Sequence, residues 1–135
     1  MIDEPQIQAF LNGSPFAVVG ASTDRSKYGN KVLRTYLQKD LAVTPVNPKA
    51  DEVEGVAAAK SLADMDGSIH GISVITPPTI TEKVVQEAIR LNIKNIWMQP
   101  GAESDAAVTA AQAAGINVIH GGPCLLVVLG FHDAH

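Results

Sequence analysis

The loop Gly20–Gly29 combines residue types that can hold a phosphate group. Gly20 ends a short apolar run and lets the chain turn sharply, and the small Ala21 and Ser22 allow an anion to approach the backbone. The free amides at a helix start, together with the helix dipole, favour negative charge at this place. The same expected phosphate site includes Arg25, Ser26, Lys27, Tyr28 and Gly29. A solvated loop with two chance positive charges is the alternative interpretation.

The sequence further along indicates which nucleotide this loop would bind. The dinucleotide fingerprint needs Gly-x-Gly-x-x-Gly, whereas the loop offers only Gly20 and Gly29. The fingerprint also needs an acidic residue about twenty positions on, which holds the ribose hydroxyls. The chain has Asn47, Pro48 and Lys49 there instead. A lysine beside the ribose suits a ribose that carries a phosphate, so NADP and coenzyme A are favoured over NAD. A simple Asn-Pro turn is the other interpretation.

Two more loops follow apolar segments and are expected to line the same cleft. Thr76, Pro77 and Pro78 form a stiff connection that donates few amides and would act as a wall against adenine or the diphosphate. A prolyl break between a strand and a helix accounts for this loop almost as well. In the second loop, Gln99 is expected to hydrogen-bond the arm of the ligand, with Gly101 beside it.

No catalytic set is recognisable in the sequence. Cys124 is the only cysteine, so it forms no intrachain disulfide and fits a reducing, cytoplasmic compartment. Its thiol either faces the sulfur of a bound coenzyme A or is buried and inert. The histidines follow no Ser-His-Asp order, and His132 and His135 are too few for a zinc site. We therefore expect no catalytic residue and no metal ligand.

The elements that must position these loops alternate along the chain. Apolar runs predict strands at 16–20, 41–46, 71–76, 95–98 and 116–119. Helical periodicity predicts helices at 3–11, 30–39, 79–92 and 104–114. This alternation predicts an α/β, Rossmann-like three-layer sandwich with a mainly parallel five-stranded sheet in the order 3-2-1-4-5. One domain is expected over residues 1–135.

Several local details of these elements are also predicted. Thr79 and Glu82 match a capping box at a helix start. Ser104 is the expected N-cap of the alanine-rich helix, and Gly115 is its expected terminator. The segment 49–60 is either an irregular excursion or a short hairpin, with solvated acidic residues at 51–54.

Composition excludes several classes of function. The chain has 135 residues and a net charge of −4 with no basic stripe, which argues against a nucleic-acid partner. No apolar stretch approaches the ~20 residues of a membrane span, and the first six residues do not resemble a signal peptide. The chain is therefore expected to be soluble. An apolar tail at 125–131 is expected to pack back on the sheet, and together with Trp97 it leaves a homo-oligomer open.

A set of short motifs covers nearly the whole chain in a characteristic order. They are Val19–Ser22, Lys27–Gly29, Pro45–Pro48, Gly55, Ser61–Leu62, Pro77, Trp97–Gly101, Ala114–Ile116 and Cys124. Together they resemble the small stand-alone CoA-binding proteins, whose fold is similar to the N-terminal CoA-binding domain of the succinyl-CoA synthetase α subunit. The resemblance implies binding of coenzyme A or an acyl-CoA. It implies Gly20–Ser22 and Lys27–Gly29 at the phosphates, Asn47–Lys49 at the adenosine, and Pro77 and Gln99 along the cleft.

The chain departs from these relatives in two respects. Gly121, Gly122 and Pro123 stand where the relatives usually carry an arginine before the cysteine. The sequence also contains neither a domain with a phosphorylated histidine nor a nucleotide-grasp partner, which the acyl-CoA ligases need. The resemblance therefore implies a binding module rather than a ligase. Two alternatives stay open: an NADP-linked oxidoreductase, and a subunit that lends its CoA site to a larger acyl-CoA enzyme partner.

Overall fold

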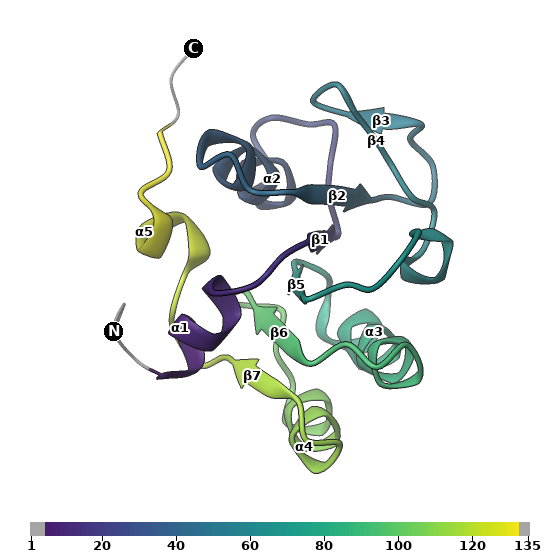
Figure 1. Ribbon diagram of the computed structural model, residues 1–135, viewed down its shortest axis with the longest axis vertical. Coiled ribbons are helices and arrows are strands. Elements are labelled where there is room, and N and C mark those ends of the chain that lie inside the picture. The colour runs from purple at the N-terminus through teal and green to yellow at the C-terminus, as the bar shows by residue number, and fades with distance from the viewer. Residues whose placement is uncertain (1–4, 133–135) are drawn as a thin grey trace.

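A parallel sheet between two layers of helices forms the centre of the molecule (Figure 1). The computed structural model describes residues 5–132. The strands of the sheet are β1 (Phe16–Val19), β2 (Val43–Val46), β5 (Gly71–Val74), β6 (Asn95–Met98) and β7 (Asn117–Ile119). Every pairing between neighbouring strands is parallel. β1, β5 and β6 are buried along their whole length, as expected for strands covered on both faces. The α/β, Rossmann-like class is confirmed.

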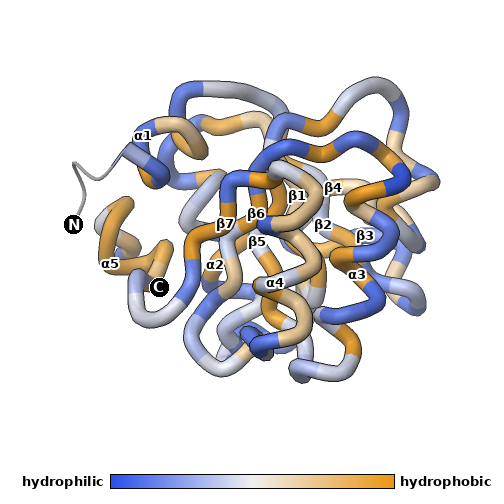
Figure 2. Tube along the Cα trace, turned by 90° about the horizontal axis from the view of Figure 1, so that it is seen from below, coloured by the Kyte–Doolittle hydropathy of each residue, from blue (hydrophilic) through white to orange (hydrophobic). Residues whose placement is uncertain are grey.

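Helices cover both faces of the sheet. One face is covered by α1 (Pro5–Leu11), α2 (Tyr28–Gln38) and α5 (Leu125–Leu129). The other is covered by α3 (Pro78–Arg90), α4 (Asp105–Ala113) and the 3-10 turn η1 (Leu62–Asp64). Figure 2 shows apolar residues along the strands and α5, with polar residues on the outer turns. None of the helices within residues 5–132 has the length and apolar character needed to cross a membrane.

The order of the strands differs in one respect from the expected one. The order is β2-β1-β5-β6-β7, so the strand predicted third in sequence, β5, pairs with β1 rather than with β2. The outer side of β2 instead holds one parallel bridge, between Val46 and Ala59. With the segment around Ala59 counted as the third member, the sheet keeps the expected 3-2-1-4-5 pattern and continues it with β7.

Pro45 explains why no full strand forms at that outer side. The carbonyl of Pro45 accepts a hydrogen bond from the Ala59 amide at 3.0 Å, so Pro45 faces away from β1. Proline has no amide proton, and a strand beside it would lose a ladder bond. The proline therefore marks β2 as an edge strand, and only a bridge forms beyond it.

A small hairpin follows β2. It consists of β3 (Glu52–Val53) and β4 (Val56–Ala57), which pair antiparallel. Of the two expectations for residues 49–60, the hairpin is confirmed. Its turn brings Glu54 toward the loop that follows β1, as the contacts below describe.

The core is divided by the alternation of side chains along the strands. Phe16 and Val18 of β1 face the layer of α1, α2 and α5, and Ala17 and Val19 face the opposite layer. Trp97 is fully buried, and its ring lies edge-on to Phe10 with centroids 5.3 Å apart. Trp97 is therefore a core residue.

The tail packs back as predicted, chiefly through its first residue. Leu125 is fully buried in the same cluster as Phe16 and Trp97. Leu126, Val128 and Leu129 are partly buried against the same cluster, whereas Val127 is exposed. α5 also contacts α2, and the Arg34 guanidinium stands 5.1 Å from the centroid of the Phe131 ring.

Helix ends confirm two of the predicted caps and contradict one. The Ser104 hydroxyl accepts from the Ala107 amide at 3.1 Å, and Gly115 has a φ of +80° just after α4, so both predictions are confirmed. The prediction of a capping box at Thr79 and Glu82 is wrong. Pro77 occupies the N-cap of α3, which places Thr79 inside the first turn, and Glu82 accepts a hydrogen bond from Ser104 at 2.8 Å instead.

Candidate functional site

Loops from five strands meet at the carboxyl edge of the sheet. The chain leaves β1 toward β2 on one side, while β5, β6 and β7 extend the sheet on the other. The direction therefore changes between the carboxyl ends of β1 and β5, which is the usual ligand position in open α/β sheets. The loop Gly20–Lys27 crosses this point and leads into α2.

Close backbone contacts at this loop require glycine at two positions. Gly20 has a φ of +95°, and a side chain there would also collide with the carbonyl oxygen of Ile75. A side chain on Gly29 would collide with the carbonyl oxygen of Gly20. Gly29 is buried, so α2 begins in direct contact with the end of β1. The two glycines thus serve the tight turn and the close helix approach without the full dinucleotide fingerprint.

The rest of the loop is held by short-range hydrogen bonds. The Asp24 amide donates to the Ser22 hydroxyl at 3.0 Å, and the Asp24 carboxylate accepts from both the amide and the hydroxyl of Ser26, at 3.0 and 2.7 Å. The hydroxyl and then the amide of Ser26, together with the Lys27 charge, hold the pKa of Asp24 below its ordinary value. The loop is therefore ordered before any ligand arrives.

Several amides of the loop remain available to an anion. Within residues 5–132, the amides of Ser22 and Thr23 have no acceptor in the protein. Lys27 is the N-cap of α2 and its side chain does not cap the helix, so the first amides of α2, at Tyr28 and Gly29, are also available. Together with the dipole of α2, they can hold a phosphate. Tyr28 is 59% exposed, so its ring stands at the mouth of this region.

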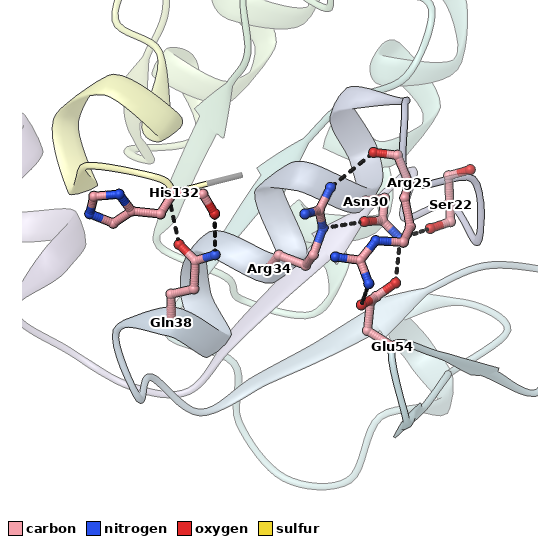
Figure 3. A network of polar contacts seen from close by, with 7 residues as sticks. All are labelled: Ser22, Arg25, Asn30, Arg34, Gln38, Glu54 and His132. Atoms are coloured by element: carbon pink, nitrogen blue, oxygen red, sulfur yellow. Dashed lines mark hydrogen bonds and ion pairs between the residues drawn. The ribbon is translucent and has the colours of Figure 1, made fainter. Parts of the chain in front are cut away.

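A polar network ties the loop to the hairpin and to α2 (Figure 3). The carboxylate of Glu54 accepts from Arg25 at 3.2 Å and from Asn30 at 3.0 Å. Asn30 is fully buried and also donates to the Ser22 carbonyl at 2.9 Å. Arg34 donates to the Asn30 side-chain oxygen at 2.7 Å and to the Arg25 carbonyl at 2.9 Å.

This network changes the interpretation of two residues. Glu54 was expected to be solvated, but its side chain is only 18% exposed and is hydrogen-bonded on both oxygens. That expectation is wrong, because the turn of the hairpin folds back on the loop. Arg25 was expected at the phosphates, and the structure directs its guanidinium to Glu54.

Asn47 and Lys49 lie beside the same loop. The Asn47 side-chain amide donates to the Ala21 carbonyl at 2.9 Å, and its side-chain oxygen accepts from the amides of Lys49 and Ala50 at 2.8 and 2.9 Å. Lys49 is exposed, and neither it nor Lys27 has an ion-pair partner within the described part of the chain. Both ammonium groups are thus free to meet a ligand.

The loop after β5 packs against Gly20. A side chain on Gly20 would meet the methyl group of Thr76 as well as the Ile75 carbonyl. The Thr76 hydroxyl is engaged with the Thr81 hydroxyl at 2.7 Å, and Pro77 and Pro78 begin α3. The loop after β5 therefore stands as a wall beside the loop Gly20–Lys27, with few groups to donate.

A cavity of about 270 Å³ adjoins the loop on the side of β6. It is lined by Tyr28, Ile75, Gln99, Pro100 and Cys124. The Gln99 side chain is almost fully buried, and both of its ends contact the chain: it accepts from the Leu125 amide at 2.8 Å and donates to the Cys124 sulfur at 3.4 Å. Gln99 thus fixes the start of α5 and the position of the thiol.

Gly101 lies outside this cavity lining. It is exposed, and its amide donates to the Glu103 carboxylate at 2.8 Å. The same carboxylate accepts from the Gly121 amide at 3.2 Å and so links the loops after β6 and β7. Within residues 5–132, no three His, Cys, Asp or Glu side chains lie together as metal ligands would. His135 lies outside the described residues.

The comparison with protein families fits this arrangement. A family model described as a CoA binding domain matches residues 14–130, which include the loops that follow each strand of the parallel sheet. The chain belongs to this CoA-binding domain family. The resemblance inferred from the short motifs is therefore confirmed.

Known proteins similar to this chain are of two kinds. A conserved hypothetical protein from Pyrococcus furiosus has a solved structure with 36% identity and a TM-score of 0.80, covering 85% of this chain and 98% of that one. The ADP-forming acetate–CoA ligase of Methanocaldococcus jannaschii is 28% identical over 78 residues, which are 58% of this chain and 11% of the ligase. The α subunit of the ADP-forming acetate–CoA ligase II of Pyrococcus furiosus is 30% identical over 88 residues, 64% of this chain and 19% of the subunit. The chain thus spans a small part of these enzymes.

The structure brings together most of the residues expected from the sequence and adds some that were missed. Asn30, Arg34, Glu54 and Glu103 were not among the expected site residues. Asn30 directly follows Gly29, and a polar residue in the first turn of a sheet-covering helix was the available signal. For Glu54 no local signal exists, because its partners lie 24 and 29 residues away in sequence.

Proposed function

We propose that this chain, acting as one domain, binds coenzyme A or an acyl-CoA and has no catalytic activity of its own. The observation that carries the proposal is the ordered loop after β1, whose Ser22 and Thr23 amides have no acceptor among residues 5–132. The α2 dipole adds to the attraction of an anion. The diphosphate of the ligand would lie there, with the Lys27 ammonium beside it.

Lys49 supports coenzyme A over ligands that lack a ribose phosphate. Its backbone is held by Asn47 at the carboxyl end of β2, next to the phosphate loop, while its side chain is free among the described residues. Rossmann-like domains bind the adenosine ribose at this position. An ammonium there suits the 3′-phosphate of coenzyme A and would not recognise the bare ribose of NAD.

The arm of the ligand would continue into the cavity beside Gln99. Ile75, Pro100 and the Tyr28 ring offer apolar contact, and Cys124 lies on the same wall. This places the proposed thiol end away from the phosphate loop and toward β6. A reducing compartment such as the cytoplasm is consistent with a free half-exposed thiol at that place.

A second candidate function is a CoA site that serves a larger acyl-CoA enzyme. The observation that favours it is the match to the two acetate–CoA ligases, in which the similar region is 11% and 19% of the enzyme. In that case a separate polypeptide would supply the catalytic residues. Co-purification of the chain with such a polypeptide at fixed stoichiometry would support this candidate.

Isothermal titration calorimetry with coenzyme A, dephospho-CoA, NADP and NAD tests the proposal. We expect the tightest binding for coenzyme A, weaker binding for dephospho-CoA, and no heat of binding for NAD. Native mass spectrometry of the purified protein then reports any ligand that is retained. Binding of NADP without binding of coenzyme A would overturn the proposal in favour of an oxidoreductase.

A further inference from the structure

Three consecutive peptide carbonyls in the phosphate loop point into the protein. The carbonyl oxygen of Gly20 lies against the Cα of Gly29, where it leaves no room for a side chain. The carbonyl of Ala21 accepts from the side-chain amide of Asn47 at 2.9 Å. The carbonyl of Ser22 accepts from the side-chain amide of Asn30 at 2.9 Å, as Figure 3 shows.

These contacts determine where the loop amides point. In a trans peptide the C=O and N–H groups of one unit point in opposite directions. The chain has one cis bond within the described residues, between Ser14 and Pro15, so both peptides in question are trans. Because Asn47 holds the Ala21 carbonyl, the Ser22 amide points the other way. Because Asn30 holds the Ser22 carbonyl, the Thr23 amide likewise points away from that carbonyl.

The other contacts of each carboxamide fix its orientation. The Asn47 side-chain oxygen accepts from the Lys49 and Ala50 amides, so its nitrogen must be the end that faces Ala21. The Asn30 oxygen accepts from Arg34 at 2.7 Å, so its nitrogen faces Ser22. The Asn30 nitrogen uses both of its hydrogens, on the Ser22 carbonyl and on Glu54, whereas one hydrogen of the Asn47 nitrogen is used, on the Ala21 carbonyl.

We propose that Asn30 and Asn47 are positioning residues, which turn the amides of Ser22 and Thr23 outward as a pair of donors for the diphosphate. They act through the backbone and do not touch the ligand themselves. Asn47 also joins the diphosphate end of the site to the ribose end, because one carboxamide holds Ala21 and the turn of Lys49. This assignment rests on the proposed CoA-binding function and goes beyond it by naming what orients the donors.

Asn47→Ser is the variant that isolates this role. A serine hydroxyl can still accept from the Lys49 amide in the same kind of turn, but it is too short to reach the Ala21 carbonyl. The change is neutral, so it adds no charge that would repel phosphate. The matched control is Asn117→Ser at the amino edge, where the Asn117 amide donates to the Gln6 carbonyl at 2.8 Å.

The diphosphate is common to coenzyme A and dephospho-CoA, so Asn47→Ser should weaken both by the same factor. We expect about a tenfold loss, the scale for impaired hydrogen bonds to a charged group. Asn117→Ser should lower the Tm to a similar extent and leave both dissociation constants unchanged. Asn47→Ala also removes the acceptor for Lys49 and should cost coenzyme A more than dephospho-CoA.

Amide resonances in ¹H–¹⁵N spectra provide a readout that loss of stability alone would not change. In the unaltered protein, coenzyme A should shift the Ser22 and Thr23 amide protons downfield. In Asn47→Ser the shift at Ser22 should shrink more than that at Thr23, and in Asn30→Ser the reverse should hold. If Asn30→Ser does not fold because Arg34 loses the Asn30 oxygen as one of its acceptors, the Asn47 variants still decide the matter.

The outcomes separate this assignment from the proposed function. Unchanged coenzyme A affinity in Asn47→Ser, or a loss confined to coenzyme A, would overturn the positioning role while the proposed function stands. Absence of coenzyme A binding by the unaltered protein would overturn both. An equal loss for both ligands, with a reduced shift at Ser22, supports the assignment.

Discussion

At both edges of the same parallel sheet, asparagine side chains donate hydrogen bonds to backbone carbonyls, with different consequences. At the amino edge, Asn95 donates to the His70 carbonyl at 3.0 Å, and Asn117 donates to the Gln6 carbonyl and to the Asn95 side-chain oxygen. At the carboxyl edge, Asn30 and Asn47 donate to the carbonyls of the loop after β1. The chemical group is the same in all four cases.

The two edges differ in whether they leave backbone amides available to a ligand. The amino edge is closed by α1: the Phe10 ring packs on Phe16 and Trp97, and the His70 ring is bonded to the Phe10 carbonyl at 2.8 Å. At the carboxyl edge, the Ser22 amide has no hydrogen-bond acceptor among the described residues. Hydrogen bonds to all the backbone groups at a strand end stabilise the fold. Hydrogen bonds to the carbonyls alone leave the amides as donors for an anionic ligand.

The largest expected effect comes from opening the amino edge with Phe10→Ala. Phe10 is fully buried and contacts two aromatic rings, so the substitution should lower the free energy of unfolding by about 3–5 kcal/mol. Urea denaturation followed by circular dichroism measures this loss. The affinity for coenzyme A of the folded fraction should not change, because the carboxyl edge is untouched. A matching loss of affinity would show that the two edges are not independent.

Gly29→Ala makes the corresponding test at the carboxyl edge. The added methyl group meets the Gly20 carbonyl oxygen and must displace the phosphate loop, at a cost of about 1–3 kcal/mol in stability. We expect coenzyme A affinity to fall by well over tenfold by calorimetry. The control is Gly71→Ala, whose methyl group meets the Phe10 ring at the amino edge. It should cost stability and spare binding, so equal binding by both variants would contradict the comparison.

Removal of single cations should leave stability nearly unchanged and weaken binding alone. Lys27→Ala removes a free ammonium beside the loop amides and should weaken coenzyme A and dephospho-CoA alike, by about 1.5–3 kcal/mol. Lys49→Ala should weaken coenzyme A more than dephospho-CoA. Calorimetry with both ligands measures each loss. If Lys49→Ala weakened the two ligands equally, Lys49 would not meet the 3′-phosphate.

The smallest expected effect is an acid sensitivity of the phosphate loop. Hydrogen bonds from Ser26 lower the pKa of Asp24 below its ordinary value of 3.8. A carboxylate with a lowered pKa in the folded state stabilises that state above pH 3.8, and the contribution is lost as the pH falls through the lower folded pKa. The Ser26 amide resonance should therefore shift with a midpoint below pH 3.8. Asp24→Asn should abolish that shift, and an unchanged shift in the variant would assign it to another group.

The sequence alone was sufficient for the class of fold, and it indicated the loop that we propose as the phosphate site. Apolar runs separated by helical periodicity determine buried parallel strands, because a strand covered on both faces needs apolar residues at every position. The small residues at Gly20–Ser22 after β1 indicate the proposed phosphate loop, because only small side chains permit an anion to approach the backbone. Ser104 and Gly115 predicted the ends of α4, since capping depends on residues within one turn.

Other features were decided only by the tertiary structure. The capping box at Thr79 failed because Pro77 is the N-cap of α3 and Glu82 found a partner 22 residues away. Glu54, which was expected in solvent, lies against Arg25 and Asn30 because the hairpin folds over the loop. Local sequence patterns determine which backbone groups at the end of an element need a hydrogen-bond partner. The packing of distant segments determines which side chain becomes that hydrogen-bond partner. The orientation of the Ser22 and Thr23 amides follows from this packing.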